Sequence, residues 1–137
     1  MKKIIFSIIL LYSYLFGADI HIEVQNLKNT VGKVSIGLYN KSENFPIVSK
    51  VYKGVHLNIG SHTLTYTFKK IPEGIHAVSV FHDENSNSKL DKNFLGIPKE
   101  GYGFSNNAKV MLSIPSFDEA KFKVSTQTVN LNIKMEY

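Results

Sequence analysis

Strict alternation of apolar and polar residues is the feature of this chain that most constrains its fold. The alternation runs through four segments, at residues 20–25, 33–39, 63–68 and 129–135. Successive side chains of a β-strand point to opposite faces, so the pattern predicts strands with one buried and one wet face. Residues 75–81 are apolar at nearly every position, which predicts a central strand covered on both faces. Weaker strands are predicted at residues 55–59, 110–114 and 121–124.

Turn residues separate these strands at short, regular intervals. The sharpest signal is Ile-Pro-Glu-Gly at residues 71–74, because proline presets φ and glycine accepts a positive φ. Helical periodicity is not sustained anywhere, and residues 45–52 and 116–120 predict at most one helical turn each. Seven or eight short strands with such turns predict an all-β fold. We expect an antiparallel Greek-key β-sandwich of the immunoglobulin-like or transthyretin-like kind, with one long loop.

The N-terminal residues differ in texture from the rest of the chain. Two lysines precede an apolar run from Ile4 to Phe16, and two small residues follow the run. This order is typical of a secretory signal peptide, and the run is too short and too interrupted to predict a membrane span. We therefore expect residues 1–18 to direct export to the periplasm or the medium. Residues 19–137 are expected to form a single domain.

Composition narrows the class of function. The chain carries 16 basic and 11 acidic residues. Two of the lysines belong to the predicted signal, so the domain has 14 basic against 11 acidic residues, a charge of +3. Its longest basic run is Lys69–Lys70, so a nucleic-acid partner is not expected. The absence of cysteine excludes disulfides, thiolate metal sites and cysteine nucleophiles.

The longest interruption of the alternation is the segment of residues 82–107. Its first half carries acidic and amide side chains at alternate positions: Asp83, Asn85, Asn87 and Asp91. Such oxygens converge in a tight loop, where the backbone carbonyl of Lys89 adds a further ligand, and hard oxygen ligands suit Ca²⁺. The spacing resembles a calcium loop without the flanking helices or the final glutamate of an EF-hand. The alternative is a metal-free loop, because Asp and Asn also bond their own backbone in turns.

The second half of this segment mixes glycines with aromatic and amide side chains: Phe94, Tyr102, Phe104, Asn106 and Asn107. Together with His82 these groups could form a binding platform, since ligand pockets combine apolar surface with a few polar groups. The expected partner is then a small molecule, a glycan or a protein of the cell envelope. The alternative is that the aromatic rings fold back and cap one end of the sandwich.

Two strings in this segment carry a family resemblance, Phe-His-Asp-Glu-Asn at residues 81–85 and the run from Asn93 to Asn107. Together with the turn at 71–74 and the Pro-Ser-Phe-Asp string at 115–118, they resemble an uncharacterised family of small exported bacterial proteins. It is the domain-of-unknown-function family numbered 2141, which commonly has glycine where this chain has Ser86 or Ser88. The resemblance implies export and a β-sandwich, and it supplies no activity and no catalytic residues.

The sequence offers little for catalysis. The five histidines lack the HExxH spacing, and the chain has neither a G-x-S-x-G elbow nor a phosphate-binding glycine loop. His82 beside Asp83 is the one general-base candidate. A small periplasmic hydrolase that uses His82 is therefore the least favoured hypothesis. The sequence thus predicts a non-enzymatic, exported binding or envelope-associated protein, with Ca²⁺ as the one expected cofactor. The alternative is a purely structural or adhesion module with a metal-free loop.

Overall fold

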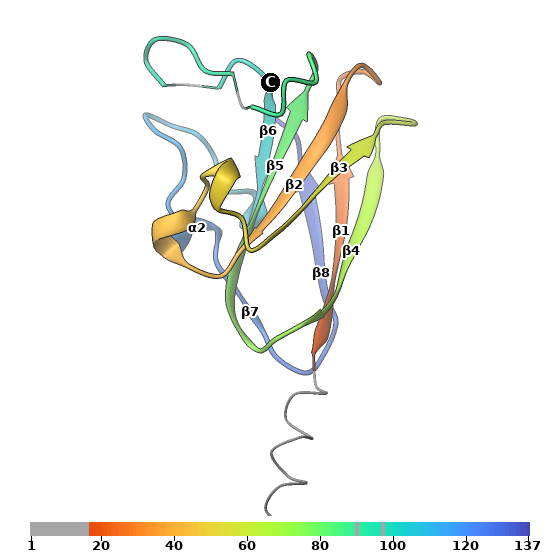
Figure 1. Cartoon of the computed structure of the whole chain (residues 1–137), viewed down its shortest axis with the longest axis vertical. Coiled ribbons are helices and arrows are strands. Elements are labelled where there is room, and N and C mark those ends of the chain that lie inside the picture. Colours follow the sequence, from red (N-terminus) through yellow and green to blue (C-terminus); the bar gives the residue numbers. More distant parts are fainter. Residues whose placement is uncertain (1–16, 90, 97) are drawn as a thin grey trace, which may run out of the picture.

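The computed structural model of the chain describes residues 17–89, 91–96 and 98–137. The predicted export signal therefore lies outside the described residues, apart from Gly17 and Ala18. The described residues form eight strands in two sheets, which pack as the two layers of a sandwich (Figure 1). This confirms the all-β fold that the alternation predicts.

The smaller sheet holds three strands in the order β4–β1–β8. These strands are β4 (Leu64–Ile71), β1 (Ala18–Gln25) and β8 (Val129–Lys134). β1 runs antiparallel to β4 and parallel to β8. The parallel pair departs from an entirely antiparallel sandwich. Parallel neighbouring strands need a long connection between them. Here the chain passes through the larger sheet between β1 and β8, which provides that connection.

The larger sheet holds five strands. In spatial order they are β3 (Lys53–Asn58), β2 (Lys33–Tyr39), β5 (Gly74–Asp83) and β6 (Gly101–Phe104), and β7 (Phe122–Val124) pairs with the start of β5. Every residue of β5 from His76 to Asp83 is buried, which confirms the predicted central strand. β3 and β7 confirm two of the weaker predictions. The strand predicted at residues 110–114 is wrong, because this segment pairs with no strand and forms a loop.

Two hydrophobic clusters explain why β5 is buried on both faces. The main core lies between the sheets and is formed by the inward-facing side chains of the alternating strands, among them Ile20, Ile22, Ile36, Val80 and Ile133. A second cluster covers the outer face of the larger sheet, where Phe45 packs edge-on against Tyr39 and Phe104 with ring centroids 5.2 and 5.9 Å away. The larger sheet is therefore covered on both sides around β5.

Short helical segments supply the outer cover. They are the 3-10 turns η1 (Ser42–Asn44), η2 (Val48–Lys50) and η3 (Ser105–Asn107) and the helix α2 (Phe117–Ala120). α2 confirms the helical turn predicted at 116–120, and η2 falls within the one predicted at 45–52. Among the described residues, none of these helices has the length and apolarity of a membrane span.

Ser105 links α2 to β5 through hydrogen bonds. Its buried hydroxyl donates to the carbonyl of Ala120 at the end of α2, and it accepts a hydrogen bond from the Val78 amide at 2.9 Å. The serine therefore satisfies two buried backbone groups at once, one on the strand and one on the helix.

Substitution of Ser105 tests this link. Ser105→Ala leaves the Val78 amide and the Ala120 carbonyl buried without this partner, so we expect the free energy of unfolding to fall by about 1–3 kcal/mol. Urea denaturation measures the change. Ser125→Ala, which alters an exposed serine, is the matched control and should stay within about 0.5 kcal/mol of the wild type. An equal effect of both substitutions would contradict the assigned role.

Candidate functional site

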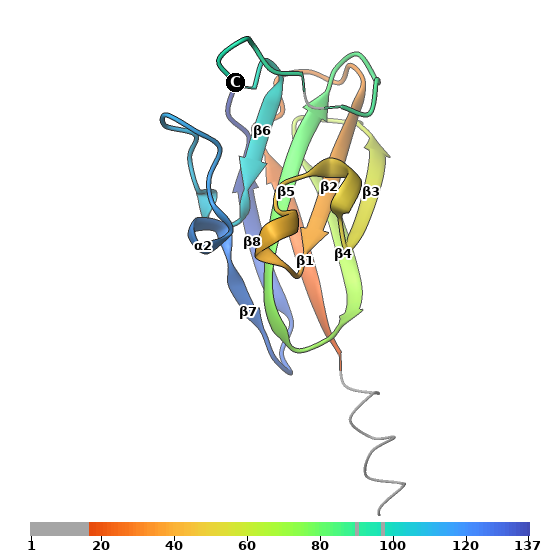
Figure 2. The same cartoon turned by 60° about the vertical axis from the view of Figure 1, so that its left-hand side comes forward.

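The candidate site lies at the end of the sandwich where β5 ends and β6 begins (Figure 1 and Figure 2). The two strands are antiparallel, and His82 of β5 pairs with Gly101, the first residue of β6. Asp83 is the next residue on β5 and Glu100 immediately precedes β6, so the register brings these two positions together. Asp83 is 4% exposed and Glu100 is 8% exposed. The strand pairing therefore buries two carboxyl groups at the base of the long segment.

The Asp83 carboxylate folds the following chain back over the strand end. Its oxygens accept hydrogen bonds from the backbone amides of Asn87 at 3.1 Å and Ser88 at 2.7 Å. To make this turn, Ser86 and Ser88 adopt φ values of 53° and 61°. This left-handed region favours glycine, so the turn holds two serines in a conformation that residues with a side chain rarely adopt.

Amide side chains gather around Asp91. The side-chain nitrogens of Asn85 and Asn87 donate to its two carboxylate oxygens at 2.7 and 3.0 Å. The Asn87 side-chain oxygen in turn accepts from the backbone amide of Lys89 at 2.9 Å. The structure thus brings together the predicted ligands Asp83, Asn85, Asn87 and Asp91, with the amide nitrogens of the two asparagines directed at Asp91.

Glu100 joins this group, although no pattern in the sequence marks it. Its side chain is hydrogen-bonded to Asp91, while its Oε2 atom is buried and has no hydrogen-bond partner. Burial, this hydrogen bond and the charges of Asp91 and Asp83 raise the Glu100 pKa to about 7. Hydrogen bonds from Asn87, Asn85 and Glu100 lower the pKa of Asp91. Below about pH 7 the proton between the two acids therefore resides on Glu100, and Asp91 is the ionised partner.

The fit of a cation to this cluster follows from its donor atoms. Within the described part of the chain, no three His, Asp or Glu side chains already stand as a metal-binding group. A cation would have to displace the Glu100 proton and draw the carboxylates inward. Rotation of the Asn85 and Asn87 amides about their last side-chain bond would place oxygens where nitrogens now face Asp91. The resulting set of carboxylate and amide oxygens is of the kind that Ca²⁺ prefers.

His82 is held by structural partners. Its Nδ1 lies 2.6 Å from the Tyr137 hydroxyl and its Nε2 lies 2.7 Å from the Val31 carbonyl. Because a carbonyl only accepts, Nε2 carries the proton and Nδ1 accepts from the tyrosine. The same Tyr137 oxygen accepts from the Lys28 amide at 2.9 Å. Both ring nitrogens are therefore engaged, and the histidine ties the C-terminus and the β1–β2 connection to β5.

The aromatic residues predicted for a binding platform are dispersed. Phe104 is fully buried in the second cluster, and Tyr102 is partly buried against the same cluster, as expected of rings that cap the sandwich. Phe94, by contrast, is 96% exposed on the loop. The structure does not gather these three rings on one surface.

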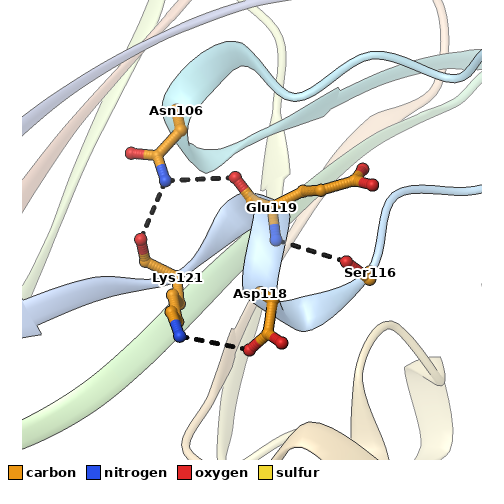
Figure 3. A network of polar contacts seen from close by, with 5 residues as sticks. All are labelled: Asn106, Ser116, Asp118, Glu119 and Lys121. Carbon is orange, nitrogen blue, oxygen red and sulfur yellow. Dashed lines mark hydrogen bonds and ion pairs between the residues drawn. The ribbon is translucent and has the colours of Figure 1, made fainter.

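The two predicted asparagines bond backbone groups. Figure 3 shows the side-chain nitrogen of Asn106 donating to the carbonyls of Glu119 and Lys121, which flank the end of α2. Ser116 is the N-cap of this helix, and its hydroxyl accepts a hydrogen bond from the Glu119 amide. Asn107 exchanges two hydrogen bonds with the backbone of β8, at Asn132 and Lys134. Both asparagines therefore position the segment after β6.

A groove runs beside the acidic cluster, between the long segment and the turns that follow β2. Its volume is 540 Å³, and it is lined by Pro46, Ile47, Val48, Ser49, Ser88, Lys89, Lys92 and Ile114. Its apolar side chains come mainly from residues 46–48. Both of its charged residues are lysines on the long segment, so the groove is lined by apolar side chains and two basic ones.

The raised pKa of Glu100 predicts a specific pH dependence of stability. The unfolded chain loses this proton near pH 4.5, whereas the folded chain keeps it to about pH 7. Between these values the folded state binds more protons, so the ionisation of Glu100 lowers the free energy of unfolding as pH rises, by about 3 kcal/mol in total. Glu100→Gln keeps a hydrogen-bond donor for Asp91 and removes the loss of stability that ionisation of Glu100 causes. The variant should gain stability relative to wild type from pH 4.5 to 7 and hold a constant advantage above pH 7.

Urea denaturation across this pH range measures the difference between the two proteins. Glu73→Gln, in an exposed turn, is the matched control and should follow the wild-type curve. A constant difference between Glu100→Gln and wild type at all pH values would mean that Glu100 does not titrate in this range.

Comparison with known protein families identifies the family of the chain. The sequence profile of a family described as uncharacterised protein conserved in bacteria (DUF2141) matches residues 22–132. This span includes all eight strands at least in part and the whole acidic cluster. Neither the comparison with curated proteins nor the comparison with solved structures gave a significant match.

Proposed function

Because the chain belongs to this uncharacterised bacterial family, whose description names no activity, we propose its function from the site. We propose that the protein is an exported, non-enzymatic binding protein of the cell envelope, and that Ca²⁺ organises its segment 82–107. The proposed ligands are the carboxylates of Asp83, Asp91 and Glu100, the side-chain oxygens of Asn85 and Asn87, and the carbonyl of Lys89.

The unpartnered Oε2 atom of Glu100 carries the proposal. A buried acceptor without a donor is costly, and here it stands beside two further carboxyl groups. Like charges that share a buried site disfavour one another, whereas a divalent cation offsets them and supplies the missing partner. Asp83 and Asp91 meet Glu100 at the base of the loop, so one ion there would fix both ends of the segment.

The coordination chemistry agrees with this choice of ion. Ca²⁺ accepts irregular sets of roughly six to eight oxygens and tolerates flexible geometry, whereas Mg²⁺ requires a near-octahedral site. The loop offers carboxylate, amide and carbonyl oxygens without nitrogen or sulfur ligands of the kind that Zn²⁺ or copper prefers. Lys89 and Lys92 stand close by, so we expect modest affinity, with a dissociation constant of about 10⁻⁴–10⁻³ M.

Two further features support a non-enzymatic, exported protein. Both ring nitrogens of His82 are bonded to structural partners, which leaves the one general-base candidate without a free nitrogen. The N-terminal charge and apolar run match a signal peptide, and a fold without disulfides would then have to persist in an oxidising compartment. An ordered, ion-bound loop would contribute to that persistence.

A metal-free structural or adhesion module is the second candidate. It is favoured by the backbone amides of Asn87 and Ser88, which already satisfy both oxygens of Asp83. In that case the loop is a self-sufficient cap, and its stability would not respond to calcium.

Calcium titration separates the two candidates. A ligand that binds only the folded state raises stability, so millimolar Ca²⁺ should raise the melting temperature by roughly 3–8 °C at neutral pH. Glu100→Gln should abolish this shift and raise the melting temperature of the calcium-free protein. Differential scanning fluorimetry with Ca²⁺, Mg²⁺ and a chelator measures both effects.

Asp118→Asn is the matched control, since it removes an exposed carboxylate on α2 that pairs with Lys121 at 3.2 Å. This variant should keep the full calcium shift. An unchanged wild-type melting temperature in calcium would refute the calcium proposal and leave the metal-free module. Calcium binding below pH 7 should also release a proton from Glu100, which isothermal titration in buffers of different ionisation enthalpy detects.

A further inference from the structure

A hydrogen-bonded turn at residues 93–96 projects from the long segment and carries two apolar side chains at its centre. The Asn93 side-chain oxygen accepts from the Leu95 amide at 2.9 Å, and the Asn93 carbonyl accepts from the Gly96 amide at 3.0 Å. Gly96 has a φ of 81°, which glycine adopts without steric cost. The turn is thus fixed by its own hydrogen bonds, and Phe94 and Leu95 occupy its two central positions.

These side chains face solvent. Phe94 is 96% exposed and Leu95 is 67% exposed. The neighbouring loop of residues 108–116 has a similar pair, with Met111 at 79% and Leu112 at 97%. The long segment lies beyond the ends of β5 and β6, and the loop of residues 108–116 stands beside the larger sheet with its tip turned toward the same end (Figure 1 and Figure 2). Large apolar side chains held outward on a built turn indicate an interaction site.

Lys92 and Lys99 flank the Phe94–Leu95 turn in the sequence, and the charge of Lys99 acts on the neighbouring Asp91. Lys92 precedes the turn and forms a backbone bridge with Pro98, while Lys99 follows it and donates its amide to the Asp91 carbonyl at 2.8 Å. Lys89 lies on the same segment and lines the groove together with Lys92. In the part of the chain that the structure describes, the ion pair of Lys121 with Asp118 is the only salt bridge. Lys89 and Lys92 are therefore available to an anionic partner.

The shape and charge of this region favour a lipid surface over a protein. A stable protein interface buries about 800 Å² on each partner, whereas each projecting tip here offers two side chains. A small apolar tip bordered by lysines suits a membrane, because the tip enters the acyl boundary while the cations meet anionic headgroups. Neither a small apolar tip nor a few lysines alone attaches a protein firmly to a membrane, and the turn combines the two.

We propose that the protein docks on anionic membranes through the Phe94–Leu95 turn, with Lys89 and Lys92 contacting the lipid headgroups. Met111 and Leu112 form the second contact with the same surface. The hydrogen bonds from the Leu95 and Gly96 amides to Asn93 close the turn without an ion, so this docking does not depend on the calcium proposal.

Vesicle co-sedimentation tests the proposal with the protein that lacks the predicted signal peptide, residues 1–18. The expected result, in the presence of a chelator, is binding to phosphatidylcholine vesicles that contain phosphatidylglycerol and much weaker binding to pure phosphatidylcholine. The double variant Phe94→Ser, Leu95→Ser should lower binding by about tenfold or more. Ile75→Ser, which removes a 44% exposed side chain from the start of β5, is the matched control and should bind as wild type.

A second pair of variants tests the charges. Lys89→Glu with Lys92→Glu should weaken binding to the anionic vesicles, whereas Lys123→Glu on the exposed face of β7 should not. All changes affect exposed side chains, and thermal melting confirms that each variant folds. The chelator makes the result independent of calcium. A repeat in calcium shows whether ordering of the loop adds affinity.

Three results would overturn the proposal. The first is equal binding of wild type to neutral and anionic vesicles. The second is full binding by the Phe94→Ser, Leu95→Ser variant. The third is a wild-type dimer in analytical ultracentrifugation that this double variant dissociates, without vesicle binding, because the turn would then be a contact between copies of the chain.

Discussion

The pairing of β5 with β6 is the constraint on which the rest of this structure depends. It sets His82 opposite Gly101, and it thereby places the two ends of a long segment side by side. Asp83 and Glu100 are buried because they flank this pair, and the segment between them must leave the sandwich and return at the same point. His82 reinforces the arrangement, since its ring holds Tyr137 and the Val31 carbonyl against the same strand. The acidic cluster is thus a direct consequence of strand register.

Alternation predicts most of the strands because it records which face of each strand is buried. It succeeds for β1, whose residues alternate between buried and half-buried along its whole length. It fails for β6, because Gly101 and Gly103 have no side chains to alternate and Phe104 is buried under the outer cover. It also fails at residues 110–114, where apolar residues recur but no neighbouring strand offers hydrogen bonds. Val110 and Ile114 pack on the second cluster from a loop.

Because the sequence does not predict β6, it reveals only part of the site. The spacing of Asp83, Asn85, Asn87 and Asp91 is a local pattern, so it can be found without knowledge of the fold, and the structure brings these residues together. Glu100 is distant from them in sequence and reaches them only through β6. Without that strand nothing distinguishes it from an exposed loop glutamate. The roles of Asn106 and Asn107 also depend on the fold, because both side chains form hydrogen bonds with backbone groups that are distant in the sequence.

Asp91 connects the acidic cluster to the projecting turn through different atoms. Its carboxylate accepts from Asn85 and Asn87 and contacts Glu100, while its carbonyl accepts from the Lys99 amide beyond the turn. An ion bound by the carboxylate would restrain the backbone of Asp91, and through Lys99 it would restrain the base of the Phe94–Leu95 turn. The turn itself is closed by Asn93 and does not require that restraint. Calcium would therefore act on membrane docking by limiting the orientations of the turn, which lowers the entropy lost when the turn meets a surface.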